Sequence, residues 1–175
     1  MKHILILTSL LAIFASCKKD SNIYGVDCSA NNAKAIQEEI DSIGRYLDLR
    51  EAKGDTIDAI LHPNGFYYVI KDVGEGDRRP ETCSAINVDY IGRRYGDPYF
   101  SNIPSIEGTV FDEGNGVNLS LYNTIAGWQQ AIPLLGLNGK IELYLPPSLA
   151  YGEKGSMSIA PNTYLLFEIT LNSFN

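Results

Sequence analysis

Beyond Gly65 the sequence is a succession of short strand patterns interrupted by one short helix pattern, and this most limits the possible folds. The aromatic and β-branched run 66–70 and the alternating run 85–92 are typical of strands, the second of them half-buried. Further strands are expected at 109–111, 117–119, 139–145 and 163–171. Residues 125–135 predict the short helix. Because strands and helices do not alternate, we predict an α+β fold, with an antiparallel half-barrel wrapped around one short helix.

An additional helix is expected ahead of the sheet, within an N-terminal helical segment of residues 30–62. The apolar positions over residues 30–53 recur at three- and four-residue steps, as in one stripe of a helix: Ala33, Ile36, Ile40, Ile43 and Leu47. Gly54 and Asp55 mark its end. The stripe either packs on the chain's own domain, or forms a dimer contact or a stalk.

Residues 1–16 differ from the rest and predict a lipoprotein signal peptide. A positive start precedes the apolar run 4–14, which is only about ten residues long, whereas a membrane-spanning helix needs roughly 20. Small residues stand just before Cys17 and resemble a bacterial lipobox, which would be cut before Cys17 and place diacylglycerol on it. An ordinary secretory signal with a chance cysteine is the alternative. Residues 17–29 then form a lipidated tether.

Charge and the residue after Cys17 bear on location and partners. Lys18 stands where many inner-membrane lipoproteins have aspartate, so we expect the outer membrane of a Gram-negative bacterium, facing the periplasm or the cell exterior. The formal net charge of −7 argues against nucleic acid or an anionic membrane face as a partner. The mature chain of about 158 residues is long enough for one domain with its own core.

Two cysteines remain after Cys17, at Cys28 and Cys83. In an exported protein such a pair can form a disulfide, and two free thiols are the alternative. His62 is the sole histidine after the signal, and neither cysteine has a histidine at metal-ligand spacing. We therefore expect no metal and no cofactor, and no catalytic triad built on histidine.

Five segments in one order resemble the FKBP family of peptidyl-prolyl cis-trans isomerases, lipid-anchored bacterial members in particular. They are 88–92 (VDYIG), 108–112 (GTVFD), 125–128 (IAGW), 145–152 (LPPSLAYG) and 159–167 (IAPNTYLLF). The resemblance implies an FKBP-type isomerase domain over residues 63–175. It also implies proline-containing exported polypeptides as substrates, whose folding the enzyme assists. The family's macrolide inhibitors are further candidate ligands.

The same resemblance implies the roles of eight residues. Catalytic roles fall to Tyr90, Asp112, Trp128 and Tyr151. Substrate contacts fall to Phe111, Ile125, Ile159 and Phe167. Trp128 would form the floor of an aromatic pocket and Ile159 would close it on the loop side. The Ile125 N–H and the Tyr151 hydroxyl would hold the substrate backbone, and Asp112 would bond to Tyr90.

An aromatic pocket suits this chemistry for a physical reason. Amide resonance sets a barrier of about 18–20 kcal/mol to rotation about a prolyl bond. The twisted transition state has lost that resonance and is less dipolar, so an apolar pocket binds it better than the planar amide. A thousandfold acceleration needs only about 4 kcal/mol of such differential binding.

The chain also departs from the family pattern. A loop at residues 93–107 is longer than in compact members, and the arginine that often pairs with Asp112 is absent, leaving Arg93 or Arg94 as candidates for its place. A second hypothesis therefore stands beside catalysis. The same fold would then be a non-catalytic chaperone or envelope-assembly module, binding partners through the pocket or the 93–107 loop.

Overall fold

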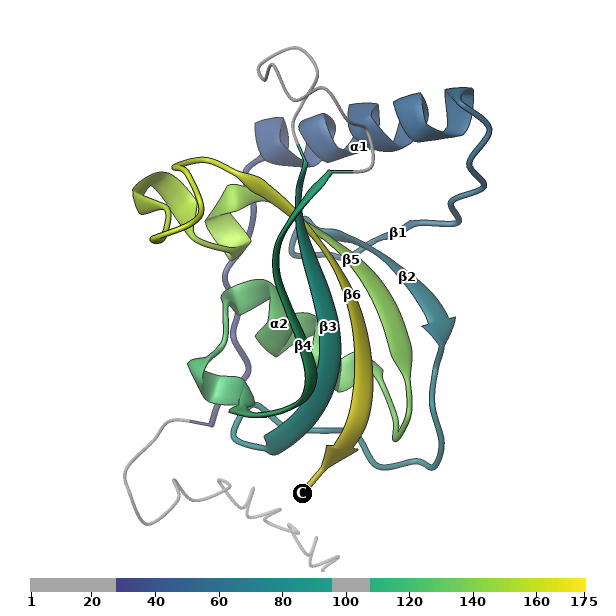
Figure 1. Cartoon of the computed structure of the whole chain (residues 1–175), viewed down its shortest axis with the longest axis vertical. Coiled ribbons are helices and arrows are strands. Elements are labelled where there is room, and N and C mark those ends of the chain that lie inside the picture. Colours follow the sequence, from purple (N-terminus) through teal and green to yellow (C-terminus); the bar gives the residue numbers. More distant parts are fainter. Residues whose placement is uncertain (1–27, 96–107) are drawn as a thin grey trace, which may run out of the picture.

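A six-stranded antiparallel sheet forms the body of the molecule (Figure 1). The computed structural model describes residues 28–95 and 108–175, so the expected signal peptide, Cys17 and most of the tether lie outside the described residues. The strands are β1 (Ile60–Leu61), β2 (Tyr67–Asp72), β3 (Ala85–Tyr95), β4 (Thr109–Ser120), β5 (Lys140–Leu145) and β6 (Tyr164–Phe174), in the spatial order β1-β2-β5-β6-β3-β4. The sheet curves around helix α2, which confirms the predicted α+β class.

The helices of the described residues are α1 (Gln37–Ala52) and α2 (Ala126–Ala131). Short 3₁₀ helices lie at η1 (Leu121–Asn123), η2 (Ile132–Leu134), η3 (Pro147–Leu149) and η4 (Gly152–Lys154). Within the part of the chain described, neither helix combines the length and apolarity that crossing a bilayer requires.

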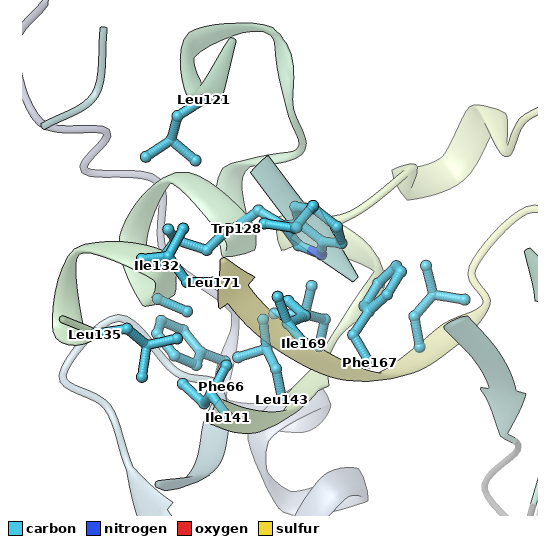
Figure 2. Packing of buried hydrophobic residues seen from close by; sticks show 14 of the residues in the cluster. Phe66, Leu121, Trp128, Ile132, Leu135, Ile141, Leu143, Phe167, Ile169 and Leu171 are labelled. Carbon is cyan, nitrogen blue, oxygen red and sulfur yellow. The ribbon is translucent and has the colours of Figure 1, made fainter. Parts of the chain in front are cut away.

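The main core lies between α2 and the face of the sheet that wraps around it (Figure 2). Side chains alternate across a strand, so Ile141, Leu143 and Leu145 of β5 face this core, while Tyr144 faces the opposite side. Burying one such side chain fully stabilises the fold by about 1.5–3 kcal/mol. This core fixes α2, and with it Trp128, against the sheet.

Helix α1 covers part of the outer face of the same sheet. Its buried stripe contacts residues that alternation places opposite the main core, and together they form a second cluster: Ile43, Tyr46, Leu47, Val69, Tyr95, Tyr144 and Leu166. The stripe expected from the sequence therefore packs on the chain's own domain. Ile36, the second position of that expected stripe, is 61% exposed and takes no part in the cluster.

The expected helix over 30–53 begins later than predicted, at Gln37. Residues 28–36, named here the N-terminal strap, run beside α2 instead (Figure 1). The backbone N–H of Ala35 donates to the carbonyl of Asn64 at 2.9 Å, a partner that a helix would not give it. The side chain of Gln130 on α2 donates to the carbonyl of Ala33 at 2.9 Å.

A disulfide between Cys28 and Cys83 ties the start of the strap to the segment that leads into β3. Of the two alternatives that the sequence left open, the structure therefore shows the disulfide. The bond crosses 55 positions of sequence and joins Cα atoms 5.3 Å apart.

The expected turn at 113–116 is a bulge within one continuous strand, so the prediction of two short strands was wrong. Val88 pairs with Val117 but Tyr90 pairs with Gly114, which leaves one extra residue on β4. Gly116 takes a φ of 63°, and its N–H donates to the carboxylate of Asp89 at 2.6 Å. Gly116 and the Asp89 carboxylate thus allow the pairing of β3 with β4 to continue where a turn was predicted.

Other bounds differ by a few residues. The helix expected over 125–135 stops at Ala131 and continues as η2, because Pro133 has no N–H with which to continue an α-helix. Strand β3 reaches Tyr95, inside the loop expected at 93–107, and residues 96–107 of that loop lie outside the described residues.

Candidate functional site

A cavity of about 280 Å³ opens where α2 meets the strands β3, β4 and β6. Its lining residues are Tyr90, Phe111, Asp112, Leu119, Asn123, Thr124, Ile125, Trp128, Tyr151 and Phe167. The structure therefore brings together all but one of the eight residues singled out from the sequence. The exception is Ile159, which is 4% exposed and belongs to the main core rather than to the cavity lining.

Aromatic rings form the floor and walls. Trp128 is 5% exposed, and its ring centroid lies 5.3 Å from that of Tyr90 and 5.3 Å from that of Phe167, both edge to face. Figure 2 shows Trp128 and Phe167 from the side of the core. Phe111 meets Phe167 at 5.7 Å. These rings meet only because position 92 is Gly92, where a Cβ would lie within 2.9 Å of both phenylalanine rings.

The floor also carries one buried polar group, the N–H of the Trp128 indole. The buried indole Nε1 of Trp128 has no hydrogen-bond partner among residues 28–95 and 108–175. Helix α2 begins at Ala126. The carbonyl of Ile125, just ahead of it, accepts a hydrogen bond from the N–H of Trp128 at 3.0 Å. The helix therefore begins at the cavity wall and fixes the direction in which the indole points.

Tyr90 and Asp112 form the polar pair at the rim. The Tyr90 hydroxyl donates to Oδ2 of Asp112 at 2.8 Å. Burial and the neighbouring Asp112 carboxylate raise the pKa of Tyr90 to about 12. Tyr90 consequently stays protonated at neutral pH, and its ring is held in place by the bond to Asp112.

Two groups at the mouth can hold a ligand backbone. Tyr151 is 37% exposed, and burial together with the charge of Asp112 raises the pKa of its hydroxyl, so that it remains a donor. The N–H of Ile125, just ahead of α2, donates to no other group within the described part of the chain. One hydroxyl and one backbone N–H are thus available to a peptide carbonyl.

Neither arginine proposed from the sequence reaches Asp112. Arg93 donates to Glu168 at 3.3 Å, and Arg94 donates to the carbonyl of Ser158 at 3.3 Å. Tyr90 is instead the partner of that carboxylate.

Sequence reasoning missed three lining residues: Leu119, Asn123 and Thr124. Alternation along the strand pattern at 117–119 would have assigned Leu119 to the inner face. Asn123 ends the 3₁₀ turn η1 and Thr124 follows it, directly ahead of Ile125, and the sequence offered no periodic signal for this turn.

A larger hollow of about 650 Å³ lies on the outer face of the sheet and has a different character. Charged side chains line it, among them Lys71, which pairs with Glu142 at 2.9 Å, and Glu168, which pairs at 3.3 Å with Arg93 outside the lining. No group of three or more histidine, cysteine, aspartate or glutamate side chains suited to a metal ion exists within the described ranges. The aromatic cavity is therefore the candidate site.

Comparison with known proteins places this site in a family. The sequence profile of the FKBP-type peptidyl-prolyl cis-trans isomerases matches residues 76–172, more than half of the chain. The chain belongs to the FKBP family. The matched range contains every residue that lines the aromatic cavity, whereas α1, β1 and β2 precede it.

Curated relatives in the FKBP family are similar over most of this chain. The peptidyl-prolyl cis-trans isomerase Mip of Coxiella burnetii is 35% identical over 115 residues, covering 63% of this chain and 45% of that protein. A probable FKBP-type peptidyl-prolyl cis-trans isomerase of Haemophilus influenzae is 30% identical over 155 residues, covering 86% of this chain and 58% of that protein. The chain thus spans about half the length of the curated relatives it matches.

Solved FKBP structures are also similar. The crystal structure of FkpA from Escherichia coli superposes with a TM-score of 0.61 at 26% identity, over 79% of this chain and 62% of that one. A peptidyl-prolyl cis-trans isomerase from Pseudomonas syringae superposes at 0.59 with 23% identity, over 82% of this chain and 98% of that one, and shows the shared fold.

Proposed function

We propose that the chain is a peptidyl-prolyl cis-trans isomerase whose aromatic cavity binds the prolyl amide in its twisted form. The observation that carries this proposal is the floor of Trp128, bounded edge to face by Tyr90 and Phe167, with no charged side chain but Asp112 among the lining residues that the structure describes. The family membership and the names of the relatives support the same activity.

The residues act by differential binding rather than by forming bonds to the substrate. The proline ring sits on the indole of Trp128, out of water. The Tyr151 hydroxyl and the Ile125 N–H hold the flanking backbone, so that rotation is confined to the prolyl bond. The planar amide loses water on entry, whereas the twisted amide has less dipole to desolvate, so the cavity lowers the barrier between the two isomers.

A peptide with one prolyl bond tests the proposal on the full-length chain in mild detergent. Tyr151→Phe removes one hydrogen bond and is expected to lower kcat/KM by about fivefold to tenfold. Trp128→Leu removes the floor and is expected to lower it further. Tyr122→Phe is the matched control, since Tyr122 is 43% exposed and lies outside the cavity lining. Equal activity of all variants would exclude this cavity as the active site.

The alternative function, a non-catalytic chaperone or assembly module, predicts a different outcome of the same experiment. An unfolded proline-containing polypeptide would then bind to the wild type and lose affinity with Trp128→Leu, while the peptide assay would show no turnover above the uncatalysed rate. Displacement of that polypeptide by a macrolide inhibitor of the family would locate the binding in the cavity.

We further propose that the protein assists folding of exported proteins from a lipid anchor at Cys17, in the outer membrane of a Gram-negative bacterium. Residues 1–16 would be the signal peptide and 17–29 the tether. The disulfide between Cys28 and Cys83 supports export, because disulfides persist in oxidising compartments. Cys17→Ser should abolish incorporation of labelled fatty acid and release the protein from membranes. Unchanged membrane retention would contradict the anchor.

A further inference from the structure

Helix α1 precedes the range matched by the family profile, yet its first turn contacts the loop that carries Tyr151. Oε1 of Glu39 accepts a hydrogen bond from the backbone N–H of Ser148 at 3.0 Å. Oε2 of the same carboxylate accepts one from the Ser148 hydroxyl. One carboxylate therefore binds both donors of a single residue that lies 109 positions further along the chain.

Ser148 lies in the 3₁₀ helix η3, three residues before Tyr151. The N–H groups at the start of a helix have no partner within it, and Pro146 and Pro147 have no N–H to offer. The next two N–H groups close the turn, from Leu149 to the carbonyl of Pro146 at 3.1 Å and from Ala150 to that of Pro147 at 2.9 Å. Glu39 supplies the acceptor that this turn lacks.

Helix α1, which carries Glu39, is held firmly against the rest of the domain. Ile43 and Tyr46 of α1 are at most 1% exposed against the outer face of the sheet. Just ahead of the helix, the N–H of Ala35 donates to the carbonyl of Asn64. Ala35 also lies so close to Gly65 that a Cβ added at Gly65 would be 2.7 Å from the Cβ of Ala35. The carboxylate can therefore transmit the position of α1 to the loop.

We propose that Glu39 is a positioning residue for Tyr151, which makes α1 part of the active-site framework. Glu39 holds η3, and η3 sets where the Tyr151 hydroxyl stands at the cavity mouth. This inference rests on the proposed function for its kinetic consequence, but the placement of the Tyr151 ring can be measured without turnover.

Kinetics of the full-length chain give the first test. Glu39→Ala is expected to lower kcat/KM by about threefold to tenfold, because misplacing the Tyr151 hydroxyl costs no more than the fivefold to tenfold expected when that hydroxyl is removed. Glu38→Ala is the control for charge, because Glu38 is exposed and shares the first turn of α1. Glu39 also accepts a hydrogen bond from the N–H of Ile36 at 3.4 Å, so urea unfolding separates the loss of this helix cap from the loss of the Ser148 contact. Glu39→Gln keeps an acceptor for the Ser148 N–H and should retain most of the activity.

A double-mutant cycle separates positioning from general destabilisation. If Glu39 acts through the Tyr151 hydroxyl, Glu39→Ala has little further effect on kcat/KM in a Tyr151→Phe background. A full and additive loss in that background would overturn the proposal, as would equal losses in Glu38→Ala and Glu39→Ala. Urea unfolding of each variant identifies any loss that comes from unfolding.

Fluorine NMR gives a readout that needs no activity. In protein labelled with 3-fluorotyrosine, Tyr151→Phe assigns the Tyr151 signal, and Glu39→Ala is expected to shift or broaden it while Glu38→Ala leaves it unchanged. An unmoved signal would overturn the proposal. A moved signal in a protein without turnover would instead support the positioning contact and contradict the proposed isomerase function.

Discussion

The hydroxyl of Tyr95 lies in the interface between α1 and the sheet, where the Tyr95 and Tyr46 ring centroids are 4.2 Å apart. The side chain is 2% exposed, and its hydroxyl has no hydrogen-bond partner among the residues described. A buried donor without an acceptor loses its bonds to water without replacement. This residue stabilises the fold through its ring and not through its hydroxyl.

We expect Tyr95→Phe to leave the free energy of unfolding unchanged or to raise it by up to about 1–2 kcal/mol. Tyr144→Phe is the matched control in the same cluster, because the Tyr144 hydroxyl bonds to Glu142. The control should lose about 1 kcal/mol. Urea unfolding measures both, and a loss in Tyr95→Phe as large as in the control would contradict the prediction.

Single residues were the best predicted part of the site. Motif order was enough to bring Trp128, Tyr90 and Tyr151 to one cavity, since each stands at a fixed place on its strand or turn. Ile159 was expected in the lining but is not among the lining residues; it is buried in the main core, where the loop turns back on itself at the isolated bridge between Ser156 and Ile159. That closure depends on backbone pairing, which residue types alone do not show.

At the scale of elements, the bulge in β4 was not predictable because Glu113 to Gly116 have the composition of a turn. The carboxylate of Asp89 decides the outcome, and it stands on a different strand. Its Oδ1 accepts from the N–H of Gly116 at 2.6 Å and from Asn172 at 2.8 Å. Since Tyr90 pairs with Gly114 directly after this bulge, the network also supports the rim of the cavity.

Asp89→Ala should lower the urea midpoint at neutral pH more than Asp77→Ala, a change at an exposed aspartate in a turn. The bond from Gly116, and then the bond from Asn172, lower the pKa of Asp89 in the folded state. A lowered pKa gives stability that is present above the unfolded value and is lost as pH falls through the folded value. The gap between wild type and Asp89→Ala should therefore close in acid, and a gap independent of pH would contradict this account.

The N-terminal strap was also beyond sequence reasoning, because Ala33 and Ile36 continue the helical spacing of α1. Their partners decide the matter, and those partners are remote: Gln130 donates to the carbonyl of Ala33, and Asn64 accepts from Ala35. The strap is thus held by α2, by the turn before β2 and by the disulfide.

Replacing both Cys28 and Cys83 with serine should lower the free energy of unfolding by about 2–4 kcal/mol, as expected for a bond that closes a long loop. Thermal or urea unfolding of the oxidised wild type, the reduced wild type and the double variant checks this. The reduced wild type should match the variant, and the variant should not respond to reductant. A reductant effect of equal size in the variant would show that the loss does not come from this disulfide.

At the scale of the whole molecule, tyrosines are buried on both faces of the sheet, under α1 on the outer face and at the cavity on the inner face. Burial raises the pKa of Tyr46, Tyr95 and Tyr144 in the α1 interface and of Tyr90 and Tyr151 at the cavity. The half-barrel around α2 was predicted, and so was a helix ahead of it whose apolar stripe could pack on the chain's own domain. The part that Tyr95 plays in this second layer was not predicted, because Tyr95 fell in an expected loop.

Raised tyrosine pKa values predict a loss of stability in alkali. Above about pH 10 the unfolded chain releases these protons while the folded chain retains them, up to a pKa of about 12 for Tyr90. The free energy of unfolding should therefore be high at about pH 8 and fall progressively above about pH 10. Urea midpoints across this range, with tyrosinate absorbance as a second probe, check it. A midpoint that stays constant through alkaline pH would contradict the raised values.

Because α1 covers the sheet, the range matched by the family profile is shorter than the part of the chain that must fold together. The matched range 76–172 omits β2, which pairs with β5, and omits the helix that covers the rings of Tyr95 and Tyr144. A fragment limited to that range would expose the apolar outer face of the sheet and leave the edge of β5 unpaired, and both features promote aggregation. A fragment that folds should therefore include α1 and β2 together with the matched range.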